Sequence, residues 1–113
     1  MFHRDIRWPN IMQSREDSSK WFLIDWEHAS FAPTKAARHM SRVGHSPKVH
    51  EDNHGADVDI WGVGRLMVTA QLRNVTPALK DLGRRMMCGH VLNAEQGLKE
   101  ICDLHIEREG GVK

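Results

Sequence analysis

The chain has 113 residues, of which 40% are hydrophobic and 27% are charged, and its formal net charge is +1. This length suits one small domain, and this composition excludes a disordered chain. The small net charge excludes strong attraction to nucleic acid or to an anionic membrane, and no apolar stretch is long enough to cross a bilayer.

The first residues lack the apolar core of a signal peptide, so we expect an intracellular protein, cytoplasmic or nuclear. Cys88 and Cys102 are the only cysteines. One disulfide is arithmetically available, but in such a compartment we expect two reduced thiols.

Residues 3–10 read His-Arg-Asp-Ile-Arg-Trp-Pro-Asn, and Asp25 follows Asn10 by fifteen residues. The segment therefore supplies an acid, an amide and a second acid, in the order that MgATP-dependent phosphoryl transfer uses. That chemistry needs a carboxylate to orient the acceptor hydroxyl and a few oxygen ligands to hold Mg²⁺ against the phosphates. We predict the first role for Asp5 and the second for Asn10 and Asp25. Each of them, taken alone, would also suit an ordinary turn.

Residues 11–24 contain two short apolar runs, 11–12 and 21–24, separated by a polar stretch. This pattern predicts a small β-hairpin with a solvated turn. Residues 28–56 follow and show no clear period, so we expect a long loop. Loops of this length usually serve a function. We expect its basic run, Lys35 to Arg42, and its histidines to face solvent.

Residues 57–72 are apolar on nearly every face, which predicts a buried helix capped by Asp57. Gly62 and Gly64 are costly inside a helix, and they make sense only where another backbone packs close. Thr76-Pro77 marks a new helix start, and Asn93 with Gln96 forms a capping box for a last helix. We place these C-terminal helices at 77–107, with an apolar stripe formed by Leu98, Ile101 and Cys102.

Three motifs in this order resemble those of the protein kinase superfamily, most closely the serine/threonine type. Residues 3–10 match the catalytic loop H-R-D-x-x-x-x-N, residues 25–27 stand at the D-F-G position, and residues 57–64 look like the start of the central C-lobe helix. The similarity covers roughly residues 2–72. It implies an α+β, mainly helical fold: a partial kinase-like C-lobe over residues 1–113, with a short catalytic hairpin and about three helices.

The resemblance also implies roles. Asp5, Arg7 and Asn10 would be catalytic, with Arg7 in place of a lysine that touches the γ-phosphate, and Asn10 and Asp25 would bind Mg²⁺ and ATP. Structural support would come from four residues: His3, Arg4, Asp59, which would reach back to the catalytic loop, and Trp61.

In the kinase interpretation, residues 28–56 correspond to the activation segment. Ser41 falls where kinases carry a threonine that contacts the catalytic aspartate, and Arg4 would pair with a phosphorylated Thr34 or Ser41. Lys48 replaces a glutamate that normally forms a buried ion pair, so that anchor is lost or rebuilt. The four tryptophans are expected in core and spine positions.

The sequence departs from the family at several points. Trp26 and Glu27 replace the Phe and Gly of D-F-G, and no glycine-rich phosphate loop precedes residue 3. We therefore expect a truncated kinase-like chain that lacks the ATP-binding lobe and is inactive in isolation. If it belongs to a complete kinase, its partners are ATP and a protein substrate.

Two alternatives stay open. Residues 24–29, Ile-Asp-Trp-Glu-His-Ala, also look like the I-D-x-E-x-A segment of choline and aminoglycoside kinases. A non-catalytic, pseudokinase-type fragment would instead bind a protein partner through an exposed apolar lobe surface. Spacing disfavours a zinc site among His45, His50 and His54.

Overall fold

The computed structural model describes residues 1–71 and 75–111, with the side chains described as far as residue 104. Within these residues the chain forms three α-helices and one two-stranded antiparallel sheet, a mixed α+β fold. The predicted class, mainly helical with a short hairpin and about three helices, is confirmed at this level. None of the described helices is long and apolar enough to span a membrane.

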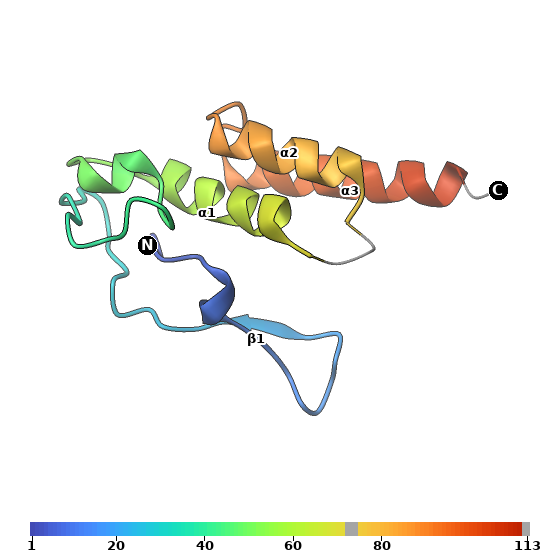
Figure 1. Cartoon of the computed structure of the whole chain (residues 1–113), viewed down its shortest axis with the longest axis horizontal. Helices are drawn as coiled ribbons and strands as arrows, with labels where there is room; N and C mark the ends of the chain where they lie inside the picture. Colours follow the sequence, from blue (N-terminus) through green and yellow to red (C-terminus); the bar gives the residue numbers. More distant parts are fainter. Residues whose placement is uncertain (72–74, 112–113) are drawn as a thin grey trace.

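The hairpin predicted for residues 11–24 is present. Strand β1 (Ile11–Gln13) pairs with β2 (Trp21–Leu23), with Ile11 opposite Leu23, and a 3₁₀ turn (Trp8–Asn10) leads into it. Figure 1 shows the hairpin reaching away from the three helices. Met12 and Phe22 are consequently exposed, as are three of the four tryptophans: Trp8, Trp21 and Trp26. The expectation that the tryptophans lie in the core is wrong for these three, because the helices do not cover the hairpin.

Helix α1 (Ala56–Thr69) is shorter than the predicted 57–72, and residues 72–74 lie outside the described ones. Gly55 is its N-cap, and the carboxylate of Asp57, in the first turn, accepts the Gly55 amide at 2.9 Å. Only four of its residues are fully buried: Val58, Ile60, Gly62 and Gly64. The prediction of a buried helix is therefore only partly confirmed; most of its other apolar side chains are half-buried.

Helix α2 (Pro77–Met87) begins as predicted, with the Thr76 hydroxyl accepting the Leu79 amide. It crosses α1 at two glycines. A Cβ atom on Gly64 would lie 2.5 Å from the Gly83 carbonyl oxygen, and one on Gly83 would lie 2.7 Å from that of Gly64. The close backbone approach expected at Gly64 is thus confirmed.

Helix α3 (Ala94–Gly111) starts at the predicted capping box. The Asn93 side chain accepts the Gln96 amide at 2.8 Å, and the Gln96 side chain accepts the Leu92 amide at 2.9 Å. The predicted apolar stripe is only partly right. Ile101 packs against a core cluster centred on Leu82, whereas Leu98 is 63% exposed and Cys102 is exposed. Both cysteines are free thiols.

Residues 28–56 contain one short 3₁₀ turn, η2 (Pro47–His50), and lie beside the start of α1 (Figure 1). Although largely irregular, the segment has its own buried cluster of Ala37, Met40, Val49 and Val58. A backbone bond from the Ala37 amide to the Val49 carbonyl closes it. The loop is thus packed in place on α1.

Candidate functional site

The start of α1 holds the segment at residues 3–5. Oδ2 of Asp59 accepts the His3 amide and Oδ1 accepts the Arg4 amide, both at 2.8 Å. Arg4 has a φ of 72°, a backbone conformation that long side chains seldom adopt. Because such strain persists only where the surroundings impose it, these two bonds define the path of the chain into Asp5.

His3 connects this segment to the end of the hairpin. Its ring is 1% exposed; Nδ1 accepts the Asp5 amide at 3.1 Å, so Nε2 carries the proton that is donated to the Ile24 carbonyl at 2.9 Å. The ring also meets the Trp26 indole edge-on, with 4.7 Å between the ring centroids. His3 therefore bonds to the chain at both Asp5 and the residue before Asp25.

Asp5 and Asn10 are both buried and bonded to each other. The Asn10 amide nitrogen donates to the Asp5 carbonyl at 2.8 Å and to Asp5 Oδ2 at 3.1 Å. The Asn10 carbonyl accepts the Ile24 amide at 2.8 Å, which places the next residue, Asp25, beside Asn10. The structure thus brings the three residues with predicted chemical roles into one region.

Two basic side chains face Asp5. Nε2 of His45 lies 2.6 Å from Asp5 Oδ1, and Nε of Arg7 lies 3.0 Å from the same oxygen, without the alignment of a hydrogen bond. His45 was not predicted as a site residue. No periodicity in residues 28–56 marks it, and the expectation that the histidines there face solvent is wrong for the buried His45 and His54.

The pKa of Asp5 is set by opposing effects. Burial, the largest single effect, raises it, but the hydrogen bond from His45, the charges of Arg7 and His45, and the Asn10 amide together lower it below the ordinary value. Because the folded-state pKa is depressed, ionised Asp5 stabilises the fold at pH values above its unfolded pKa. This stability is lost as pH falls below 3.8 and through the folded pKa.

Replacing His45 with alanine should therefore raise the pKa of Asp5, because one hydrogen bond and one positive charge are lost while burial remains. A pH titration of the Asp5 carboxyl carbon by NMR would measure it. Arg7→Met removes only a charge and should give a smaller rise. An unchanged or lower pKa in His45→Ala would contradict the assignment of these causes.

Arg4 is bound within residues 28–56. Its Nε donates to the His28 carbonyl at 2.6 Å and its Nη1 to the Lys35 carbonyl at 3.1 Å. Thr34 is 1% exposed and its hydroxyl donates to the His54 carbonyl, so the expectation that it is a phosphorylation site is wrong for this conformation. Ser41 is exposed, as are the basic residues of the run from 35 to 42.

Asn10 and Asp25 both carry side-chain oxygens, the ligand type that Mg²⁺ prefers. The Asn10 side chain bonds through its nitrogen, which leaves its oxygen for a metal, and Asp25 presents an exposed carboxylate at a φ of 60°. Two hard oxygen ligands with water completing the octahedron are typical of Mg²⁺. Glu27 is engaged with His28, at 3.4 Å. In the described residues, no three His, Cys, Asp or Glu side chains cluster as metal ligands.

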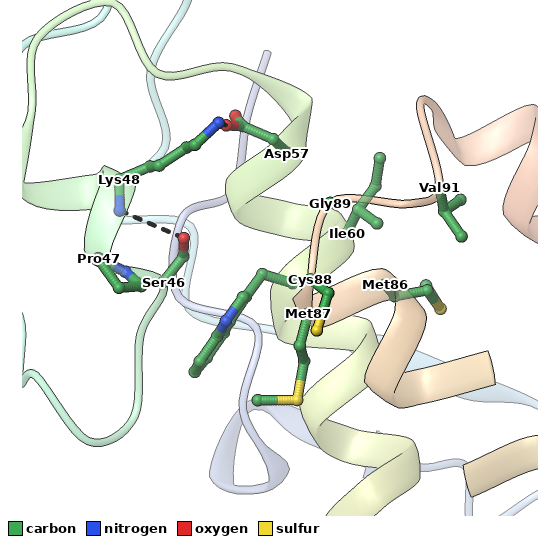
Figure 2. Close-up of a pocket in the computed structure, with 11 residues that line it drawn as sticks. Ser46, Pro47, Lys48, Asp57, Ile60, Met86, Met87, Cys88, Gly89 and Val91 are labelled. Carbon is green, nitrogen blue, oxygen red and sulfur yellow. Dashed lines mark hydrogen bonds and ion pairs between the residues drawn. The ribbon is translucent and has the colours of Figure 1, made fainter. Parts of the chain in front are cut away.

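Lys48 forms an ion pair with a residue at the start of α1. Its Nζ lies 3.3 Å from Asp57 at the start of α1, in a partly exposed ion pair (Figure 2). Beside this pair is a pocket of about 260 Å³ whose lining includes Ile60, Trp61 and Met86. Trp61 is half-buried there and makes no described contact with Asp5. Lys48, for which the anchor was expected to be either lost or rebuilt, thus forms a partly exposed ion pair with Asp57.

Comparison with known proteins finds one relative of note. The chain is 29% identical over 105 residues to Crinkler effector protein 8 of Phytophthora infestans. The match covers 89% of this chain and 17% of that protein, so the chain spans a small part of its relative. No protein-family model matches the chain. No solved structure matches it.

Proposed function

We propose that the chain carries the acceptor and metal-binding half of a protein-kinase-like phosphotransferase site, of the type that transfers phosphate from ATP to serine or threonine hydroxyls. One observation carries the proposal: the Asp59 carboxylate accepts both amides that lead into Asp5. The resemblance to kinases implied that Asp59 reaches back in this way. Structural support from His3, Arg4 and Trp61 belongs to the same proposal.

In this proposal each residue has one task. Asp5 orients the acceptor hydroxyl, Asn10 and Asp25 hold Mg²⁺ through their side-chain oxygens, and Arg7 lies beside Asp5 as a cation for the transferred phosphate. Mg²⁺ bound with ATP would supply charge neutralisation on the phosphates.

The sequence lacks one part that phosphate transfer from ATP needs. The 113 residues contain no G-x-G-x-x-G sequence to cover the phosphates of ATP. We therefore propose that phosphate transfer by this chain alone is below detection. Phosphate transfer to choline or aminoglycosides, but not to peptides, would instead favour a small-molecule kinase.

Manganese tests the proposed metal site at Asn10 and Asp25, because Mn²⁺ accepts the same oxygen ligands as Mg²⁺ and broadens nearby NMR signals. Adding Mn²⁺ with ATP to the ¹⁵N-labelled chain should broaden the amide signals of Asn10 and Asp25 before others. In Asp25→Ala, the Mn²⁺ concentration needed for the same broadening should rise about tenfold or more, since one of two protein ligands is lost.

Asp81→Ala is the matched control, because Asp81 is an exposed acid on α2, a helix that carries none of the proposed site residues. It should leave the broadening at Asn10 and Asp25 unchanged. Broadening spread over surface carboxylates, equal in both variants, would reject the metal site.

A specific observation favours a second function, that of a non-catalytic binding module. Four apolar side chains of the hairpin region are each at least half exposed: Met12, Trp21, Phe22 and Trp26. Met12 and Phe22 pair across the two strands and so share one face of the hairpin, and an exposed apolar face commonly marks a binding site. A chain that binds a protein through the hairpin and shows no response to Mn²⁺ would fit this function.

A further inference from the structure

One histidine of the long segment lies directly against the proposed catalytic carboxylate. His45 is 6% exposed, and its Nε2 is 2.6 Å from Oδ1 of Asp5, which is also 6% exposed. Forty residues separate the two in sequence. A short contact between two buried ionisable groups is a charge-assisted hydrogen bond, among the strongest kinds in proteins.

The ionised Asp5 carboxylate can only accept, so it fixes the direction of this bond, and the partners of the second ring nitrogen decide how many protons the ring carries. Nδ1 of His45 lies 3.0 Å from the Ser41 carbonyl oxygen and 3.2 Å from the Ser41 hydroxyl. If Nδ1 donates to the carbonyl, both nitrogens carry protons, because a carbonyl and a carboxylate only accept. If the hydroxyl donates to Nδ1, the single ring proton resides on Nε2. In both arrangements His45 donates to Asp5.

The remaining contacts of Asp5 show which acceptor position of its carboxylate stays unoccupied. Oδ1 faces His45 and the Arg7 guanidinium, and Oδ2 accepts the Asn10 amide at 3.1 Å. A carboxylate has about four acceptor positions, so one position on Oδ2 stays available. Rotation of the carboxylate, which would exchange the two oxygens, is opposed by partners on both.

We propose that His45 is a positioning residue for Asp5: its Nε2–H holds Oδ1, so that Oδ2 is presented to the acceptor hydroxyl. The role of Asp5 in this statement rests on the proposed phosphotransferase function. A consequence is that residues 28–56 must be packed on α1 for Asp5 to be positioned, because Ser41 and His45 belong to that segment.

The ¹H–¹⁵N spectrum of the full chain, labelled at its eight histidines, tests this bond. The His45 Nε2 proton should exchange slowly with water and should shift in Asp5→Ala. Its exchange should quicken there by about tenfold or more, because a hydrogen bond to a charged group is lost. A His45 signal that exchanges as fast as that of the exposed His39, and that ignores Asp5→Ala, would overturn the proposal.

Rescue by a similar side chain separates positioning from packing. At a fixed pH, His45→Gln keeps an N–H donor and should retain a near-native chemical shift of the Asp5 carboxyl carbon, whereas His45→Leu should not. His39→Gln and His39→Leu are matched controls and should leave that shift unchanged. Equal displacement in both His45 variants would overturn the proposal.

The outcomes stay separable from those of the proposed function. If Mn²⁺ fails to broaden Asn10 and Asp25 while the His45 proton remains protected, the phosphotransferase site is rejected and the His45–Asp5 bond stands. If His45→Leu does not fold, the wild-type chain and Asp5→Ala still decide the bond.

Discussion

Asp59→Ala should destabilise the chain by about 3 kcal/mol, because two backbone amides lose a charged acceptor at once. The amides of His3 and Arg4 both donate to this carboxylate at 2.8 Å. Arg4 also loses the restraint on its positive φ, so the path into Asp5 should relax. Urea unfolding measures the stability, and hydrogen exchange at the two amides measures the release.

Asp59→Asn keeps one oxygen acceptor and should give an intermediate loss. Asp81→Ala, an exposed acid on α2, should change stability by less than about 0.5 kcal/mol. Equal stabilities for wild type and Asp59→Ala, with unchanged exchange at His3 and Arg4, would show that the two bonds do not hold the segment.

Gly64→Ala should destabilise the chain by about 3 kcal/mol, because the added methyl group overlaps sterically with atoms of α2. Its Cβ would lie 2.5 Å from the Gly83 carbonyl oxygen and 2.8 Å from Cβ of Met86. Backbone and Cβ atoms cannot turn aside as a flexible side chain does, so α1 and α2 must separate. The loss should appear as a lower urea midpoint in circular dichroism.

Gly97→Ala is the matched control within a helix. A Cβ there meets nothing closer than 3.5 Å, so the gain in helix propensity should dominate and stabilise α3 by up to about 1 kcal/mol. If both glycine variants are stabilising, the backbones of α1 and α2 are not in close contact at Gly64 and Gly83.

Local signals in the sequence accounted for much of the fold. The Thr76 cap, the capping box at Asn93 and Gln96, and the hairpin were predicted correctly, because each depends on neighbours within a few residues. The bounds of α1 were less accurate, since the apolar pattern continues past Thr69 although the helix ends there. The predicted burial was wrong for Leu98 and for the tryptophans of the hairpin region, because periodicity does not reveal whether another element covers a face.

The candidate site shows the same division. The sequence by itself determined which side chains offer the chemistry: Asp5, Asn10 and Asp25 were named from residue type, order and spacing. It also marked Gly64 as a point of close backbone contact. Only the tertiary structure decided that His45 bonds to Asp5, that Thr34 is buried, and that Lys48 pairs with Asp57. Each of these depends on how residues 28–56 pack on α1, and contacts across 9 to 40 residues leave no period in the sequence.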